Sequence, residues 1–269
     1  MSPADATGEG LRVRHDGGAA WLTIDRPDAL NALDRATKEA LLAALREAAA
    51  DQTVRAVALT GSGRAFCVGE DLRELRGAYA GGHAPELGET LEHHYGPIVR
   101  LLAEMPKPTV ALVNGIAAGA GASLALACDL RLASSAASFK LAFSGVGLVP
   151  DAGATWSLPR LLGLSTALRL ALLDDQVKAE EALALGLVGR VFPAEDFERL
   201  AAEAVSALAA GPTLAHARTK ALLRDNLHAG LAAALAAEAE AQGASGRTKD
   251  HLEGVAAFSE KRAPRFQGA

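Results

Sequence analysis

Two glycine-rich stretches constrain this chain more than any other feature, because each follows a short apolar run and precedes a helical pattern. The first is GSGRAFCVGEDL, residues 61–72, and the second is NGIAAGAGAS, residues 114–123. Small residues let a backbone approach a ligand closely, and the start of a helix offers N–H groups without an intrahelical partner. Two such starts aimed at one point would form an oxyanion hole. Ordinary strand-to-helix turns have a similar composition, so either stretch alone leaves both interpretations open.

A dinucleotide-binding fold is a third interpretation, and the pattern disfavours it. Neither stretch fits G-x-G-x-x-G, and no acidic residue follows about 20 residues later at a strand end. The flanking pattern instead mixes short strands with helices over residues 10–190. We expect a hairpin around Asp16-Gly17-Gly18 and a helix from about Asp34. Further strands are expected over 54–61, 107–115 and 129–134, and further helices over 91–105, 120–128 and 156–162.

The composition changes after about residue 194, where no strand pattern remains. Helices are expected over 196–210, 213–226, 231–242 and 253–261, and their apolar stripes need a partner surface. We therefore expect two regions, a mixed core over residues 1–195 and a helical region over residues 196–269.

Composition excludes several function classes. Half of the 269 residues are apolar, which supports a sizeable core, and the net charge of -5 disfavours a nucleic-acid-binding protein. The two cysteines, Cys67 and Cys128, are too few for a disulfide framework and are expected to be buried thiols. The polar N-terminus has no signal-peptide pattern and no apolar run is long enough to span a membrane, so a cytoplasmic protein is expected.

A third segment, GVGLVPDAGATWSLPRLLG over residues 145–163, holds Asp151 among apolar neighbours. This aspartate either caps the helix that starts near Thr155 or serves as a general base whose pKa is raised by an apolar pocket. The spacing alone leaves both roles open. The adjacent His93 and His94 would point about 100° apart on a helix and are expected to be solvated, so no metal site is expected.

In combination, these segments resemble the crotonase, or enoyl-CoA hydratase/isomerase, family. The matches are RPDALNAL, LTGSGRAFCVGEDL, KPTVALVNGIAAGAGASLALACDLRLA, the loop near Asp151 and FSEKRAPRF, together covering roughly residues 11–265. The resemblance implies an α/β fold, a spiral of ββα units with a helical C-terminal trimerisation region. It also implies a homo-oligomer, a trimer or a dimer of trimers, that acts on acyl-CoA thioesters without a further cofactor.

The resemblance also implies site residues. The thioester oxygen would accept hydrogen bonds from the backbone N–H groups of Glu70 and Ala120, where relatives often have glycine instead of Ala120. Lysine is common in relatives at the position of Asp28, which weakens one phosphate contact. The expected substrate and CoA contacts are Arg64, Ala65, Val68, Gly69, Asp71, Arg73, Gly119, Ser123, Phe143, Phe258 and Lys261, the last two from the C-terminal helix.

Departures from the family pattern favour one reaction within it. Hydratases use two glutamates, and the matching positions here are Ser123 and Phe143. Asp151 matches an aspartate that isomerases and other non-hydratase relatives use, and AFSGVGLVPDAGATWSLPRLLG is most similar to the ring-epoxide isomerases of phenylacetate degradation. We therefore expect an acyl-CoA isomerase with Asp151 as its acid and base. The alternatives are a hydratase that recruits another acid, first Glu70, and a CoA-ester-binding protein without turnover.

Overall fold

The computed structural model describes residues 6–80 and 86–269, and its main element is a seven-stranded sheet. The strand order is β1-β2-β3-β4-β6-β8-β11, antiparallel from β1 to β3 and parallel from β3 to β11. The predicted hairpin and the three predicted strands are all present. The strands are β1 (Ala6–Gly8), β2 (Leu11–Asp16), β3 (Ala19–Ile24), β4 (Ala56–Gly61), β6 (Thr109–Val113), β8 (Leu130–Ser134) and β11 (Arg190–Phe192).

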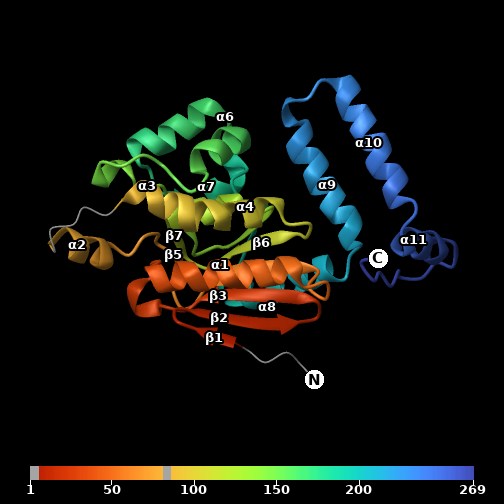
Figure 1. The fold of residues 1–269 in the computed structure, drawn as a ribbon, viewed down its shortest axis with the longest axis horizontal. Helices are drawn as coiled ribbons and strands as arrows, with labels where there is room; N and C mark the ends of the chain where they lie inside the picture. The colour runs from red at the N-terminus through yellow and green to blue at the C-terminus, as the bar shows by residue number, and fades with distance from the viewer. Residues whose placement is uncertain (1–5, 81–85) are drawn as a thin grey trace.

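A second sheet of four short strands lies above the first in the order β10-β9-β7-β5 (Figure 1). Its strands β5, β7 and β9 are parallel to one another, and β10 is antiparallel to β9. The sequence analysis treated the glycine-rich stretches as turns between a strand and a helix, whereas each contains a strand of this sheet. The strands are β5 (Ala65–Cys67), β7 (Ile116–Ala118), β9 (Ser138–Lys140) and β10 (Val177–Lys178).

Three consecutive units give the chain its spiral course. Each unit places one strand in the large sheet, turns sharply, places the next strand in the small sheet and continues into a helix. This arrangement confirms the expected spiral of ββα units. The units are β4–β5 with α2 (Leu72–Ala80), β6–β7 with α5 (Ala120–Ala127), and β8–β9 with α6 (Ala154–Leu173).

Helices cover both faces of the large sheet because its central strands are apolar on both faces. One face packs against the buried sides of α1 (Arg35–Ala50), α4 (Gly96–Glu104) and α5. The other face carries small residues such as Ala56 and Ala58, on which Phe197 and Val205 of α8 (Phe197–Ala209) pack. Asp34 begins α1 as predicted, since its carboxylate accepts from the backbone N–H of Thr37 at 2.8 Å.

The remaining elements surround the small sheet or extend from the body. Helix α3 (Leu87–Thr90), the π-helical turn η2 (Leu91–Tyr95) and α4 run on from one another beside the small sheet (Figure 1). The other connecting elements are η1 (Pro27–Ala29), η3 (Ser144–Val146), α7 (Ala179–Leu185), η4 (Ala194–Asp196) and η5 (Asn226–His228). Helix α6 begins earlier and runs further than predicted, with a kink at Gly163.

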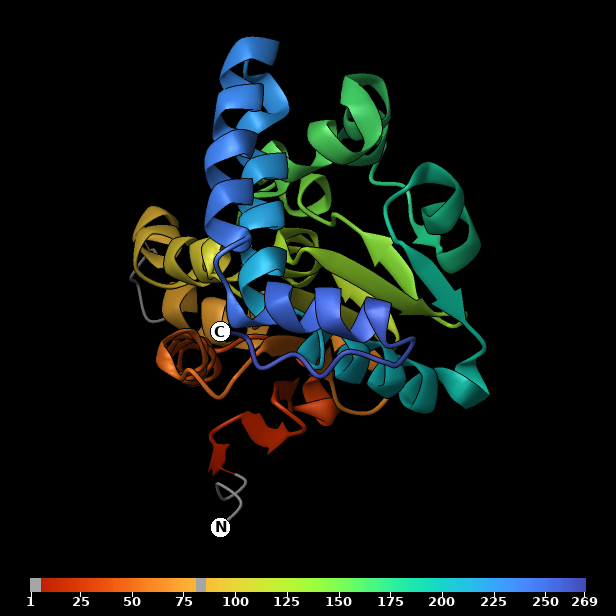
Figure 2. The ribbon, with the colours of Figure 1, turned by 90° about the vertical axis from the view of Figure 1, so that its right-hand side faces the viewer.

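The C-terminal region is helical, as expected. Helices α9 (Thr213–Asp225) and α10 (Leu231–Ser245) stand side by side and project from one flank of the body, and α11 (Lys249–Ser259) lies across their base (Figures 1 and 2). Helix α8, by contrast, packs into the body. The division at residue 195 remains a prediction.

Three further expectations depend on burial and position. Both cysteines are buried, as predicted. Over the two described ranges, no helix has the length and apolar character needed to cross a bilayer. The expectation about the N-terminal segment falls in part on residues 1–5, which lie outside the described residues.

Candidate active site

A cavity of about 540 Å³ opens where the three parallel strands of the small sheet end. Parallel strands of α/β proteins commonly place ligands at their carboxyl ends. Each of these strands contributes the residues that follow it, and leucine and valine side chains from α2, α3, η2 and the 146–149 segment complete an apolar wall. The lining after the strands consists of Val68 and Glu70 after β5, Gly119 and Ala120 after β7, and Ala142 and Phe143 after β9.

Glu70 and Ala120 both line this cavity, and Gly69, the residue before Glu70, lies against the backbone at Ala120. A Cβ atom added to Gly69 would come within 2.9 Å of the Ala120 nitrogen, and the φ angle of +90° at Gly69 also requires glycine. Ala120 is the first residue of α5, so its N–H has no intrahelical acceptor. Gly119 precedes it with φ +52°, which turns the chain from β7 into the helix. The structure therefore brings Glu70 and Ala120 to one cavity, and their role as a pair of donors remains a prediction.

The backbone at Glu70 is held by its neighbours in the chain. Gly69 accepts from the N–H of Leu33 at 2.7 Å, and the N–H of Asp71 donates to Leu33 at 3.1 Å. These two bonds use the carbonyl of Gly69 and the N–H of Asp71, so the backbone is fixed on either side of Glu70. Leu33 is held in turn by the RPDALNAL segment, whose buried Asn31 donates to the carbonyls of Ser62 and Ala65 at 2.8 and 2.7 Å.

Asp151 lines the same cavity and does not cap α6. The N-cap position of that helix is Gly153, which makes no side-chain capping bond, and only the backbone carbonyl of Asp151 contacts the helix start, accepting from Ala154 at 2.9 Å. The Oδ1 atom of Asp151 is buried and has no hydrogen-bond partner. Burial, followed by repulsion from Glu70, raises the pKa of Asp151 to about 6. The capping interpretation is thus wrong, and the carboxylate is available for proton transfer near neutral pH.

The Glu70 side chain is engaged by two residues that the sequence analysis missed. Its Oε1 accepts from Nζ of Lys38 at 2.5 Å, and its Oε2 accepts from the hydroxyl of Tyr95 at 2.6 Å. Burial and the charge of Glu70 raise the pKa of Tyr95 well above its usual value. Lys38 lies on α1, 32 residues before Glu70. Nothing in the neighbouring sequence indicates that this lysine is buried. Tyr95 is one of two tyrosines in the sequence, and nothing near it indicates that it contacts a site residue.

The two positions where hydratases carry glutamate hold no acid. Phe143 contributes its ring to the cavity wall and is almost fully buried. Ser123 is completely buried on α5 and donates its hydroxyl to the carbonyl of Gly119 at 3.3 Å. Ser123 therefore lies beneath the cavity floor, behind the Ala120 donor.

The residues expected to contact CoA do not all line the cavity. Val68, Asp71 and Arg73 line the cavity, as does Asp28 at its rim, while Arg64 is exposed and Ala65 is buried in β5. The Asp71 carboxylate is already used, because it binds Arg26 at 2.9 Å and accepts from the backbone N–H of Arg73 at 2.9 Å.

Phe258 and Lys261 lie at the end of α11, on the opposite side of the molecule from α2 (Figure 1). The Phe258 side chain is 87% exposed. Within one chain, these two residues do not join the cavity that holds Asp151.

The histidine expectation holds only in part. His93 is exposed, whereas His94 is half-buried, with an Nδ1 atom that has no partner and an Nε2 atom 3.7 Å from Glu39. Across residues 6–80 and 86–269, no three histidine, cysteine or acidic side chains gather closely enough to hold a metal ion.

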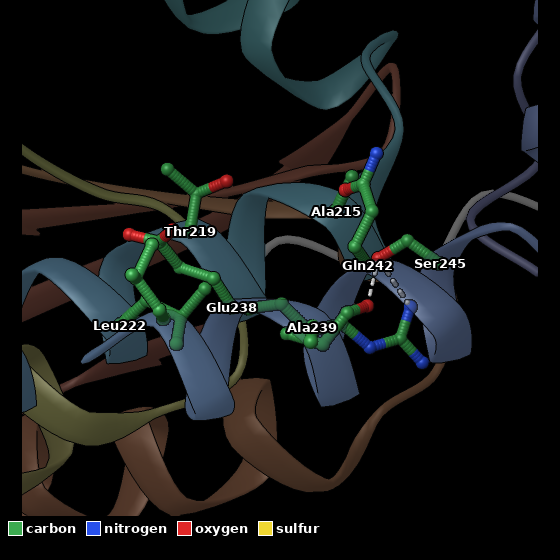
Figure 3. A pocket seen from close by; sticks show the side chains of 10 residues that line it. Ala215, Thr219, Leu222, Glu238, Ala239, Gln242 and Ser245 are labelled. Carbon is green, nitrogen blue, oxygen red and sulfur yellow. Dashed lines mark hydrogen bonds between the residues drawn. The ribbon is translucent and has the colours of Figure 1, made fainter. Parts of the chain in front are cut away.

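A second hollow of about 520 Å³ lies between α9 and α10 (Figure 3). There Arg218 donates to the Ser245 hydroxyl at 3.3 Å, and that hydroxyl donates to the Ala241 carbonyl at 2.8 Å. These polar groups satisfy one another, and Glu238 is the one acid among the residues that line the hollow. Among its described lining residues, the hollow therefore has no buried, unpartnered acid of the kind that Asp151 provides in the first cavity.

Comparisons with known proteins agree with this geometry. Residues 14–269 match the family model described as enoyl-CoA hydratase/isomerase. The chain is 44% identical over 258 residues to a Rhodobacter capsulatus protein named as a probable enoyl-CoA hydratase, covering 96% of this chain and 98% of that protein. It is 41% identical over 251 residues to the 1,2-epoxyphenylacetyl-CoA isomerase of Escherichia coli, covering 93% and 95%. A solved structure from Mycobacterium abscessus aligns with a TM-score of 0.91 at 40% identity, covering 96% of this chain and 100% of that chain.

Proposed function

The chain belongs to the enoyl-CoA hydratase/isomerase family, and we propose that it is an acyl-CoA isomerase in which Asp151 carries the proton. The observation that carries this proposal is the Asp151 carboxylate, whose Oδ1 is buried without a hydrogen-bond partner and which lines the same cavity as Glu70 and Ala120. The absence of an acid at both Ser123 and Phe143 favours a reaction that needs one proton carrier rather than two.

The reaction follows from these groups. The thioester oxygen of the substrate accepts from the N–H groups of Glu70 and Ala120, which stabilises the negative charge that develops on that oxygen. Asp151 removes a proton from a carbon of the acyl group, and the resulting enolate is held by the two donors. Protonated Asp151 then returns the proton at another carbon, so the double bond moves, or a ring epoxide on the acyl group rearranges. One oxyanion donor contributes about 3 kcal/mol to such a reaction, and the chain needs no cofactor beyond the CoA of its substrate.

The lining of the cavity favours a neutral, apolar acyl group. Its walls are built mainly from aliphatic side chains together with Tyr95 and Phe143. Among the described residues that line it, carboxylates at positions 28, 70, 71 and 151 stand against the cation Arg73, and Lys38 and Arg26 offset the charges of Glu70 and Asp71, so the balance stays negative. A second carboxylate on the acyl group would be repelled there, so we propose aromatic or aliphatic monoacyl-CoA esters as substrates. The identity to the epoxyphenylacetyl-CoA isomerase supports the aromatic choice.

A hydratase is the second candidate, because Glu70 and Asp151 are two acids in one cavity, and some relatives are named as hydratases. Hydration requires one acid to activate water and another to donate a proton. Both oxygens of Glu70 already accept hydrogen bonds from Lys38 and Tyr95. This engagement makes Glu70 a poor partner for water and favours isomerisation.

The test compares wild type with Asp151→Asn, which keeps the shape of the side chain but cannot carry a proton. Across a panel of aromatic and aliphatic unsaturated acyl-CoA esters, kcat for isomerisation should fall by about 10² to 10⁴ while ester binding persists. In heavy water, wild type should exchange an acidic C–H proton of the bound ester and the variant should not. Asp28→Asn, which removes another carboxylate from the same cavity, is the matched control and should retain kcat.

Three outcomes would contradict the proposal. Hydration of crotonyl-CoA with a kcat above roughly 10 per second, an ordinary enzymatic rate, would favour the hydratase. Binding of the esters without turnover or proton exchange would indicate a CoA-ester-binding protein. Unchanged isomerisation by Asp151→Asn would move the base elsewhere, first to Glu70.

We also propose that the chain forms a trimer or a dimer of trimers through its C-terminal region. Apolar side chains on that region are strongly exposed, among them Leu223 at 71%, Leu231 at 76% and Phe258 at 87%. Such a surface is costly in an isolated subunit. Light scattering should give a mass three or six times 27.6 kDa, and removal of the residues after Leu231 should give monomers or aggregates with weakened CoA-ester binding. A truncated protein that stays trimeric and binds esters normally would contradict this assignment.

A further inference from the structure

One buried ion pair next to the cavity is not used by the reaction described above. Lys38 is 3% exposed, and its ammonium group lies 2.5 Å from a carboxylate oxygen of Glu70. The other oxygen of that carboxylate accepts from Tyr95, which is 2% exposed. The ammonium group also lies over the Tyr95 ring, 5.5 Å from its centre. These three residues come from α1, from the segment after β5 and from η2, so the arrangement is tertiary rather than local.

The network fixes the Glu70 side chain in one orientation. Both carboxylate oxygens have a short donor, and the side chain remains 27% exposed on the cavity side. An ion pair buried only for stability gains little over apolar packing, because desolvation offsets the attraction between the charges. Here the negatively charged partner, Glu70, lines the same cavity as Asp151.

Electrostatics links the network to Asp151. After burial, the charge of Glu70 is the cause that raises the pKa of Asp151, and Asp151 in turn contributes to the raised pKa of Tyr95. Because its pKa is high, the Tyr95 hydroxyl keeps its proton and donates a hydrogen bond to the Glu70 carboxylate. Other ionisable groups also surround this cluster: Cys67, whose pKa is also raised by burial, His94 next to Glu39, and Asp71, which is paired with Arg26. Further charged or titratable residues line a pocket together with Lys38 and Glu70, namely Arg35, Glu74, Glu86, Glu89 and His93.

We propose that Lys38, Glu70 and Tyr95 form a positioning network for Asp151, in which Lys38 and Tyr95 hold the Glu70 carboxylate so that its negative charge stays fixed in the cavity that Asp151 also lines. The proposal rests on the proposed function only in the role it gives to Asp151. A carboxylic acid that ionises near the working pH is effective both in taking up and in returning a proton. Glu70 thus has two separate parts in the site: its N–H binds the substrate oxygen, and its side chain tunes Asp151.

The test is a direct titration of Asp151 by ¹³C NMR of its carboxyl carbon, assigned by its loss in Asp151→Asn and measured without substrate. Glu70→Gln keeps the N–H and the shape but removes the charge. The titration midpoint of Asp151 should fall by about 0.5 to 1 pH unit, as expected for loss of a nearby like charge. The acid limb of the pH profile of kcat/KM should move by the same amount. Glu70→Asp, which retains the charge, should stay closer to wild type.

Asp225→Asn provides the control and should leave the midpoint unchanged, because Asp225 is an exposed acid that lines neither the cavity of Asp151 nor the pocket beside Lys38 and Glu70. If Glu70→Gln fails to fold because Lys38 is left unpaired, Lys38→Met combined with Glu70→Gln removes the pair together and carries the same prediction of a lower midpoint. A midpoint that stays within about 0.2 pH units of wild type, or rises, would overturn the proposal. A lowered midpoint in a protein that isomerises no ester would preserve the network and refute the proposed function instead.

Discussion

Replacing Asp151 by asparagine should stabilise the folded protein at alkaline pH, in addition to its effect on turnover. In the unfolded chain this carboxyl ionises near the ordinary value of 3.8, whereas burial and Glu70 raise its pKa to about 6 in the folded protein. The folded state therefore binds the proton more tightly than the unfolded state. Its ionisation opposes folding, so this destabilisation begins near pH 4, grows as the pH rises and is complete above about pH 6.

The magnitude follows from the difference between the two pKa values. A rise from 3.8 to about 6 corresponds to about 3 kcal/mol at 1.36 kcal/mol per pH unit. Asp151 is only half-buried and the cavity is open to solvent, which screens part of this cost. We therefore expect Asp151→Asn to gain about 1–2 kcal/mol in free energy of unfolding, relative to wild type, between pH 4 and pH 8.

The assay is urea unfolding of both proteins at pH 4 and pH 8, at one fixed protein concentration because assembly shifts apparent stability. The pH dependence of the difference in unfolding free energy between variant and wild type separates the effect of ionisation from any effect of the new amide on packing. Asp225→Asn removes the same charge from a side chain that is 64% exposed and should produce no such gain. A difference between Asp151→Asn and wild type that is the same at both pH values would refute the reasoning, since the carboxylate would then not be destabilised by its surroundings.

Gly69→Ala should lower kcat/KM by about 100-fold while the protein stays folded, because the new methyl group would lie 2.9 Å from a donor nitrogen of the oxyanion site. Circular dichroism would confirm folding, and activity within about threefold of wild type would argue against that site. Cys67 and Cys128 are buried, and burial raises the pKa of both thiols to about 12. Mass spectrometry after iodoacetamide treatment at pH 8 should therefore find both unmodified in the native protein and both modified after unfolding. Rapid native modification of either thiol would contradict this.

Much of the fold could be predicted because its signals are local. The apolar runs of β4, β6 and β8 are long enough to be identified in the sequence, and Asp34 indicates the start of α1 as a helix-capping residue. The glycine-rich stretches indicated where the backbone comes closest to a ligand, and the helical C-terminal region followed from its periodicity. Strands β5 and β7 could not be predicted from period, since each has only three residues and exists because it pairs with its neighbours in the small sheet.

The candidate site could likewise be predicted only in part from the sequence. The resemblance to the family implied roles for Gly69, Glu70 and Ala120 and the lack of acids at the two hydratase positions, and the sequence itself singled out Asp151 in an apolar loop. The structure brings Glu70, Ala120 and Asp151 to one cavity, while their catalytic roles remain predictions. The choice between a helix cap and a buried base at Asp151 had to wait for the tertiary structure, since both roles suit an aspartate before a helix.

Lys38 and Tyr95 illustrate what only the tertiary structure decided. Nothing near either residue in the sequence distinguishes it from an ordinary helix lysine or core tyrosine, yet folding places both against Glu70. The raised pKa of Asp151 likewise comes from burial and from the charge of Glu70, both of which exist only once distant segments have packed together. Residue type sets which proton a side chain can carry, and the packing of distant segments sets the pH at which it does so.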